Sequence, residues 1–387
     1  GYCIFIAQYW GKQDIPSIKR YLGLIILYAL GIGLLFTLVG LLFAEQIILL
    51  FNDDPEVVQL GAVYIRTLAA GTLFSGLTYA FGYASRSIEN TFLPMIASTI
   101  ALGANTLLNY ILIFGKFGFP EMGVKGAAIA TVAAKFIEAL VVIAWTHAKP
   151  EKNKYIVGVF RRFTIPRELV GKMLIKGLPL LFNEFLWAAG MSIIAQCYSV
   201  RGLDVVAARN ISSTMTNLFG AIYIQLGSCI GIIVGAKLGA NKLKEALCTD
   251  NKLLFFSVAV TVVVAAIIIP FAGIFPNIYK TSEEIRSLAS YMIIVQALTM
   301  PLWSYTNACY FTLRSGGKTG ITFLFDFGYT FLFMIPLAFI LTYFTDMDIR
   351  PLWAVVTFSE IIKVIIGYFM VKSDLWINNI VDTAEKK

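Results

Sequence analysis

LLFFSVAVTVVVAAIII, the run at residues 253–269, contains no charged side chain and is bounded by Lys252 and Pro270. A second run, Ile321–Tyr343, is longer and carries one charge, Asp326. A transmembrane helix needs about 20 mostly apolar residues to cross about 30 Å of hydrocarbon, and these runs approach or exceed that length. The two runs therefore predict helices that span a membrane.

The composition of the whole chain agrees with this prediction. Hydrophobic residues make up 58% of the 387 residues and charged residues 14%, whereas a soluble domain carries about 25% charged residues. Because apolar runs recur along the chain, a signal peptide or a single anchor is excluded. We predict an all-α polytopic membrane protein, with a partial span at Gly1–Trp10 followed by ten full spans. Those spans are 21–51, 57–85, 92–115, 124–147, 172–200, 205–236, 246–272, 284–313, 320–344 and 351–371.

Cysteine and histidine usage argues against enzymatic chemistry. The five cysteines form no CxxC pair, and His147 is the only histidine. Scattered cysteines of this kind act as small apolar packing residues. We therefore expect no catalytic residues, no metal site and no cofactor, and we expect that the chain is not an enzyme.

Basic residues are distributed unevenly between the two sets of alternate loops. One set holds 21 of the 31 Lys and Arg residues, and the opposite set holds six, beside acidic residues such as Asp53 and Asp346. By the positive-inside rule the first set is cytoplasmic. We predict a multi-pass protein of the cell membrane (plasma or inner membrane), with the basic loops and the C-terminus in the cytoplasm. The net charge of +8 then comes from the basic cytoplasmic loops and does not indicate nucleic-acid binding.

The sequence repeats itself with an offset of 228 residues. Arg86 aligns with Arg314, and Lys135, inside one predicted span, aligns with Lys363 inside another. Since equivalent loops then lie on the same side of the membrane, the repeat is a parallel one. Parallel repeats form two bundles around a central binding site, and rocking of one bundle against the other gives alternating access.

The repeat also sets the expected domain organisation. Two spans precede Gly239, but only ten residues precede its counterpart Gly11. We therefore expect that the first helix and most of the second are missing from this chain, and that the complete fold has two pseudo-symmetric six-helix lobes. We predict a partial N-lobe at 1–147, a cytoplasmic linker at 148–167 and a C-lobe at 168–387.

Four stretches carry a family resemblance. They are AQYWGKQD at Ala7–Asp14, LGANTLLNYILIFG at Leu102–Gly115, GFPEMGVKGAAIAT at Gly118–Thr131, and GLP at Gly177–Pro179. Together they resemble the multidrug and toxic compound extrusion (MATE) family, and the resemblance covers essentially the whole chain. It implies a cell-membrane antiporter with two six-helix lobes, which exports amphipathic and often cationic compounds in exchange for H⁺ or Na⁺.

The resemblance implies particular coupling residues, and this chain departs from several of them. The family's N-lobe site uses an aspartate in helix 1, absent here, and an Asn-x-x-x-Asp pair in helix 5, which reads Asn105 and Asn109. Many relatives carry a glutamate in helix 7 eight residues after the proline, whereas Glu184 lies five residues after Pro179. Trp303 stands where many relatives place an aspartate in helix 10. These departures leave both H⁺ and Na⁺ open as the coupling ion.

Two acidic residues inside predicted spans are the candidates for ion coupling. Glu184 lies between Phe182 and Leu186, and Asp326 lies among aromatic residues at 323–327. A charged carboxylate there costs several kcal/mol unless it is paired, hydrated or protonated, so exchange of a proton is the role that such a residue suits. The alternatives are a glutamate that snorkels or pairs near the helix entrance, and an aspartate with a structural role at the interface.

Polar amide side chains within spans are the candidates for a substrate or ion cavity. Asn105 and Asn109 are four residues apart and therefore share one helix face. For Asn183, Gln196, Asn210 and Asn307 the alternative role is interhelical hydrogen bonding. The full set of predicted amide residues is Asn105, Asn109, Asn183, Gln196, Asn210 and Asn307. Arg209, beside Asn210, is a further candidate for the wall of such a cavity.

Two lysines inside predicted spans have acidic neighbours on their own helices. Lys135 has Glu138, and Lys363 has Glu360, each at a separation of three residues. This spacing places the charges on one helix face and predicts local ion pairs. The recurrence of the lysine in both copies of the repeat favours an architectural role over a role in transport.

The sequence thus predicts a secondary antiporter that works by alternating access. Its partners are small amphipathic or cationic molecules and the lipid bilayer, it binds no nucleic acid, and it is a monomer. The alternative is a flippase for lipid-linked saccharide precursors of the same superfamily. A flippase cavity must be strongly basic to hold pyrophosphate, and this chain has few cations within its spans, namely Arg66, Lys135, Arg209 and Lys363.

Overall fold

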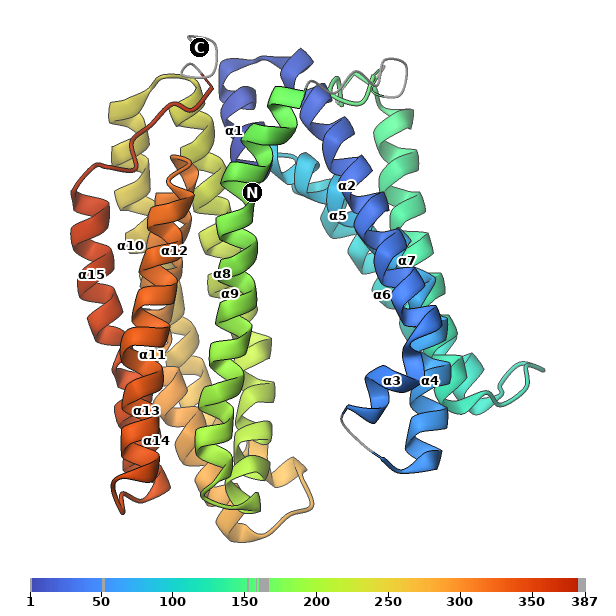
Figure 1. The fold of residues 1–387 in the computed structure, drawn as a ribbon, viewed down its shortest axis with the longest axis vertical. Helices are drawn as coiled ribbons and strands as arrows, with labels where there is room; N and C mark the ends of the chain where they lie inside the picture. The colour runs from blue at the N-terminus through green and yellow to red at the C-terminus, as the bar shows by residue number, and fades with distance from the viewer. Residues whose placement is uncertain (1, 51–52, 152, 158, 160–166, 382–387) are drawn as a thin grey trace. The chain divides into compact units, whose positions relative to one another are not determined.

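The computed structural model describes residues 2–50, 53–151, 153–157, 159 and 167–381, which form helices and their connections (Figure 1). The chain divides into two compact units, Tyr2–Val170 and Gly171 onward. We call them the N-terminal unit and the C-terminal unit and describe each by itself. The predicted linker 148–167 includes residues 152, 158 and 160–166, which lie outside the described residues.

Nine of the ten predicted spans are confirmed within the described residues, and the tenth, 57–85, corresponds to a bent pair of helices. Nine helices are long and apolar enough to cross a membrane, and a bent pair of shorter helices brings the number to ten. Helix limits differ most at the predicted span 21–51. The helix begins earlier, at Ile15, because Asp14 caps it by accepting a hydrogen bond from the Ser17 backbone N–H at 3.1 Å. It ends at Leu42 and is followed by a separate short helix.

The N-terminal unit contains seven helices in the described residues. They are α1 (Tyr2–Lys12), α2 (Ile15–Leu42), α3 (Ala44–Leu49), α4 (Pro55–Ala69), α5 (Gly71–Ser87), α6 (Phe92–Phe114) and α7 (Gly123–Ala148). Helices α4 and α5 are long and apolar enough to span a membrane only as a pair, and they meet at a bend of 43°. The carbonyl of Ala69 at the bend accepts hydrogen bonds from Thr37 at 2.9 Å and from Thr72 at 2.8 Å. These bonds satisfy a backbone group that the break releases, as a membrane interior requires.

The C-terminal unit contains the remaining helices. They are α8 (Arg167–Ser199), α9 (Leu203–Gly239), α10 (Leu243–Phe271), η1 (Phe275–Ile278), α11 (Glu283–Ser315), α12 (Thr319–Tyr329), η2 (Thr330–Met334), α13 (Ile335–Tyr343), α14 (Ile349–Phe358) and α15 (Glu360–Lys372). Helices α12, η2 and α13 form one span, and η2 is a π-helical turn directly before Pro336. Proline cannot donate to the helical ladder, so a local change of pitch at this point is expected.

Helices α9 and α11 pack closely at a row of glycines on α9. Gly227 and Gly231, four residues apart on one helix face, both lie against Phe311 of α11. A Cβ atom at Gly227 would lie 2.3 Å from the Asn307 side-chain oxygen and 2.7 Å from the Phe311 ring. Small residues at a spacing of four let two helix backbones approach in a membrane. The glycines therefore set the distance between these two helices, which form the centre of the C-terminal unit.

One end of the C-terminal unit is closed by the segment that follows α15. Trp376 in this segment is fully buried, and its indole N–H donates to the carbonyl of Val371 at 2.9 Å. Asn378 donates to the carbonyl of Gly316 at 3.3 Å, and Lys176 of α8 donates to the carbonyl of Gly317 at 2.8 Å. The basic loops after α9 and α11 thus gather at the same end as the chain's C-terminal segment.

Candidate functional site

A buried ion pair lies inside the C-terminal unit. The Lys363 ammonium of α15 lies 2.5 Å from one carboxylate oxygen of Asp326 on α12, and the side chains are 8% and 13% exposed. The other Asp326 oxygen accepts a hydrogen bond from the Asn183 amide of α8 at 2.8 Å. Three membrane-spanning segments therefore meet at one carboxylate, and its charge state affects how they are held together.

A second carboxylate lies beside the pair and is incompletely satisfied. Glu360 is fully buried and interacts electrostatically with Lys363. One of its oxygens accepts a hydrogen bond from Thr306 of α11 at 2.8 Å, and the other has no hydrogen-bond partner among the described residues. Two carboxylates thus share one ammonium. A charge left uncompensated in hydrocarbon is costly, so this group of residues is suited to bind one further proton.

The predicted coupling residue Glu184 is linked to this group but lies outside it. Its side chain is exposed in the middle of α8, and one oxygen accepts a hydrogen bond from the Tyr310 hydroxyl at 3.4 Å. The Tyr310 oxygen in turn accepts from Asn183 at 3.5 Å. The two acids singled out from the sequence, Glu184 and Asp326, are therefore the ends of one polar chain across α8, α11 and α12. The links through Tyr310 are long and hence weak.

The local ion pairs predicted for the two lysines differ in their outcome. Lys135 pairs with Glu138 at 2.9 Å, as predicted, and Ser98 donates to the same carboxylate at 2.7 Å. Lys363 forms its direct ion pair with Asp326 on another span, and Glu360, the predicted partner, interacts with the ammonium electrostatically without a direct pair. The direct partner of Lys363 lies on α12. The spacing of residues along α15 therefore could not predict it.

The repeat explains how the two lysine sites are related. At the offset of 228, Ser98 corresponds to Asp326 and Thr78 corresponds to Thr306, both of which lie around the equivalent lysine. In the N-terminal unit the lysine site borders a cavity of about 230 Å³, whose lining includes Thr78, Ser98 and Lys135. Both units thus keep a lysine in a polar pocket, but only the C-terminal one surrounds it with two acids from two spans.

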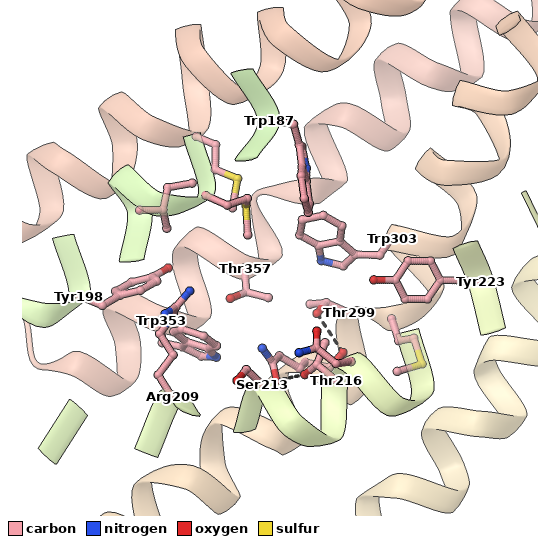
Figure 2. Close-up of a pocket in the computed structure, with 16 residues that line it drawn as sticks. Trp187, Tyr198, Arg209, Ser213, Thr216, Tyr223, Thr299, Trp303, Trp353 and Thr357 are labelled. Atoms are coloured by element: carbon pink, nitrogen blue, oxygen red, sulfur yellow. Dashed lines mark hydrogen bonds between the residues drawn. The ribbon is translucent and has the colours of Figure 1, made fainter. Parts of the chain in front are cut away.

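A second cavity, separate from the ion pair, lies within the C-terminal unit. It has a volume of about 230 Å³ and is lined from α8, α9, α11, η2 and α14. Figure 2 shows Trp187 and Trp303 on one side of it, and Tyr198, Arg209 and Trp353 together on another side. The Tyr198 and Trp353 rings pack with their centres 4.9 Å apart. We call this space the aromatic cavity. Its apolar walls and few polar groups are typical of a small-molecule site.

Trp303 and the other cavity tryptophans were not predicted as site residues. They are spread over 166 positions, from Trp187 to Trp353, and each resembles an ordinary lipid-facing aromatic when read alone. One signal was present in the sequence. Trp303 occupies the helix 10 position where the resemblance led us to expect an aspartate, and the structure places it in the wall of the aromatic cavity.

The remaining amides predicted for a cavity occupy different environments. Asn105 accepts a hydrogen bond from Asn109 at 3.1 Å, so the two share a helix face, and the Asn109 oxygen is buried without a partner among the described residues. Gln196 and Asn210 are exposed. The Asn307 oxygen is buried close to Gly227 at the α9–α11 contact. None of these five amides is among the residues that line the aromatic cavity.

The fold and its interior define a class of protein. Two helical units carry a parallel sequence repeat, and ionisable side chains lie buried at membrane depth in each. Intramembrane charges of this kind mark ion and substrate pathways, and parallel repeats are an architecture of secondary transporters. The chain is a polytopic membrane transporter.

Comparison with known proteins identifies the family. A family model described as MatE matches residues 1–111 and 179–340. The chain is 22% identical over 375 residues to the probable multidrug resistance protein YoeA of Bacillus subtilis, and 27% identical over 374 residues to the probable multidrug resistance protein NorM of Photorhabdus laumondii. In both cases the match covers 95% of this chain and 80% of the relative. The chain belongs to the MATE family of multidrug efflux transporters and is not an enzyme.

Solved structures agree with the fold. An outward-facing multidrug resistance transporter of the MATE family superposes with a TM-score of 0.88 at 19% sequence identity. The match covers 96% of this chain and 82% of that one. The predicted all-α polytopic fold is therefore confirmed. The alternative function of a lipid-linked saccharide flippase is not favoured, because the relatives are described as multidrug resistance proteins.

Proposed function

We propose that this transporter is a secondary antiporter that exports amphipathic aromatic compounds in exchange for protons. The observation that carries the proposal is the buried group of Lys363, Asp326 and Glu360 in the C-terminal unit. Two carboxylates and one ammonium leave an excess negative charge that a proton can neutralise. The aromatic cavity in the same unit supports the substrate class, because its walls fit flat apolar molecules.

The proton is a better coupling ion for this group than sodium. The Lys363 ammonium already occupies the position next to Asp326 that a metal cation would take, and like charges at such distances repel strongly where the dielectric constant is low. A proton needs no such position, because it can bond directly to the free oxygen of Glu360 or replace the ammonium as the partner of Asp326.

Protonation can change the balance between two conformations through the contacts of Asp326. When Asp326 is charged, it binds Lys363 of α15 and Asn183 of α8 at once. A neutral carboxyl group binds the ammonium much more weakly, so α12 and α15 are then held together less tightly. A ligand shifts a conformational equilibrium by its difference in affinity for the two states, and the proton is here that ligand. Alternating access of the two units follows from this shift.

We propose a cell-membrane location with the basic loops and the C-terminus in the cytoplasm. Asn379 near the C-terminus donates to the carbonyl of Gly239 at 3.4 Å, so the C-terminal segment lies at the end of the unit that carries Lys237 and Lys242. The positive-inside rule assigns that end to the cytoplasm. We further propose that the transporter acts as a monomer.

The proposal can be tested with purified protein in liposomes. Uptake of two amphipathic dyes of opposite charge, ethidium and fluorescein, is measured in liposomes with an acidic lumen in a neutral bath. We expect at least one of the two dyes to accumulate in the lumen. Nigericin with K⁺, which collapses the pH gradient, should stop the accumulation. Accumulation driven by a Na⁺ gradient at equal pH would contradict proton coupling, and movement of neither dye under a pH gradient would contradict the proposed export of amphipathic aromatic compounds.

Glu184→Gln is expected to slow proton-driven transport by less than about tenfold and to leave it dependent on the pH gradient. Glu184 is exposed and reaches the buried group only through the 3.4 Å contact with Tyr310, and such a weak bond contributes about 0.5–1.5 kcal/mol. Initial rates of dye uptake at several pH gradients measure the effect. Tyr310→Phe removes the same link and should reproduce the result. If dye uptake by Glu184→Gln no longer depended on the pH gradient at all, Glu184 rather than the buried group would be the coupling residue.

A further inference from the structure

We propose that the aromatic cavity of the C-terminal unit binds aromatic compounds that carry an anionic group, such as a carboxylate. This inference names a substrate class and therefore rests on the proposed transport function. It departs from the cationic class that the family resemblance implies. The charge and the hydrogen-bonding groups that face the cavity carry the argument, and they come from α9, α11 and α14.

Arg209 is the first of these groups. It is the only Lys, Arg, Asp or Glu among the sixteen residues that line the cavity. Within the described part of the chain no carboxylate forms an ion pair with it. An unpaired guanidinium in the wall of a cavity at membrane depth is costly unless water or a ligand compensates it. A guanidinium binds a carboxylate through two parallel hydrogen bonds.

The indole N–H of Trp353 is the second group. The Trp353 side chain is 5% exposed and lines the cavity, and its Nε1 atom is buried without a hydrogen-bond partner among the described residues. An indole nitrogen only donates, so the group that it lacks is an acceptor. Figure 2 shows Trp353 and Arg209 in the same wall of the cavity.

Gln296 adds a third donor. Its side-chain oxygen accepts hydrogen bonds from Ser212 at 2.7 Å and from Thr216. With the oxygen engaged in this way, the amino group of the amide is the part of Gln296 that remains for the cavity. Arg209, Trp353 and Gln296 thus supply donors in the cavity lining. The lining hydroxyls and Asn217 can donate as well as accept, so the lining favours a ligand that carries acceptors.

Aromatic walls alone do not decide the charge of a ligand. Tryptophan and tyrosine faces also attract cations through cation–π contacts, and the three tryptophans here fit that alternative. A cation in this cavity, however, would be repelled by Arg209 and would leave the buried Trp353 donor unmatched. An unmatched buried donor costs about 1–3 kcal/mol. The arrangement of polar groups therefore favours an anion over a cation.

The volume limits the size of the ligand. A cavity of about 150 Å³ is enough for benzene, and the aromatic cavity holds about 230 Å³. One or two fused rings with a carboxylate fit this space. Three ligands with the same ring system and different charge therefore make a matched set: 2-naphthoate, 2-naphthamide and 2-naphthylmethylammonium.

The test measures binding of the three ligands to the purified full chain by quenching of tryptophan fluorescence and by calorimetry. We expect 2-naphthoate to bind at least about tenfold more tightly than the amide, and the ammonium compound to bind most weakly. Arg209→Gln should remove the preference for 2-naphthoate, with at least about a tenfold loss of its affinity and little change for the amide. Trp353→Phe, which keeps a ring but lacks the N–H, should weaken 2-naphthoate several-fold.

Controls separate this inference from other causes. Arg350→Gln removes an exposed arginine of the same unit, which lies outside the cavity lining, and should leave all three affinities unchanged. If Arg209→Gln does not fold, Arg209→Lys retains the charge and should keep the preference at reduced affinity. Equal binding of all three ligands, tighter binding of the ammonium compound, or no binding of 2-naphthoate would each overturn the proposal. Binding of 2-naphthoate through Arg209 without transport under a pH gradient would instead contradict the proposed function alone.

Discussion

Asp326→Asn is expected to abolish proton-driven dye uptake in liposomes, with at least about a tenfold fall in the initial rate, while dye binding remains. An asparagine cannot gain or lose a proton, yet its side-chain oxygen can still accept the hydrogen bond from Asn183. The shape of the site is therefore nearly unchanged. The variant loses only the ability to take up and release a proton where α8, α12 and α15 meet. Uptake under a pH gradient and equilibrium dye binding, measured on the same preparation, separate the two effects.

The same substitution should also lower the stability of the protein, because it removes the carboxylate that bonds directly to Lys363 and leaves only Glu360 to compensate the ammonium. Removing one member of a buried pair costs about 3–5 kcal/mol, unless the remaining group loses its charge. Asp326→Asn/Lys363→Met removes both members of the pair and should recover most of the melting temperature in detergent at a pH low enough for the buried Glu360, which loses its ammonium neighbour, to take up a proton, since replacing a buried pair by neutral groups is often without cost. The double variant should nevertheless remain inactive in proton-driven uptake.

Stability and coupling can therefore be told apart. Asp374→Asn, the same change at an exposed aspartate after α15, should alter neither the melting temperature nor the uptake rate. A double variant that is stable and still accumulates dye under a pH gradient would place coupling outside the Lys363 group. A double variant that is stable and inactive would show that the lost charges matter for transport itself.

Hydropathy and the repeat were sufficient to predict the architecture of the chain. Ten apolar stretches gave the spans, because the length of a membrane helix is set by the bilayer rather than by tertiary contacts. Helix ends were predicted less well where local capping decides them. Asp14 and Ser17 start α2 within residues 11–20, which lie between the predicted partial span Gly1–Trp10 and the predicted span 21–51.

The interior of the C-terminal unit was predictable only in part. Asp326 was identified because a charge inside an apolar run is visible in sequence. Its partner was not, because Asp326 and Lys363 are 37 residues apart and on different spans, whereas Glu360 lies at helical spacing from the lysine. Hydrophobic pattern tells which residues enter the membrane. It does not tell which side of a helix meets which neighbour, and that depends on packing over the whole unit.

The glycines of α9 illustrate a signal that was visible and unused. Gly227, Gly231, Gly235 and Gly239 are spaced by four residues, a pattern that favours close helix contact in membranes. The structure places the first two against Phe311 of α11. This contact lies between the two helices that pack most extensively in the C-terminal unit, and one of them carries the aromatic cavity's Arg209. The spacing of these helices therefore affects the cavity as well as the fold.

Gly227→Leu is expected to destabilise the protein by about 1–3 kcal/mol, the usual cost of inserting side-chain atoms into a packed interior. Even the first added carbon would lie 2.3 Å from the Asn307 oxygen and 2.7 Å from the Phe311 ring, so α9 and α11 must separate or these side chains must move. For a unit of about 200 residues this cost corresponds to a fall of several degrees in the melting temperature. Melting in detergent, followed by size-exclusion chromatography of heated samples, measures it.

Two further variants show whether the contact with Phe311 is the cause. Gly103→Leu makes the same change at a glycine in the middle of α6 that has nothing within 4 Å of an added Cβ, and it should leave the melting temperature unchanged or raise it slightly. Phe311→Ala opens space opposite Gly227, so the double variant Gly227→Leu/Phe311→Ala should be less destabilised than the sum of the two single changes. Additive losses would mean that the added side chain is accommodated elsewhere, and that the glycine row does not set the distance between α9 and α11.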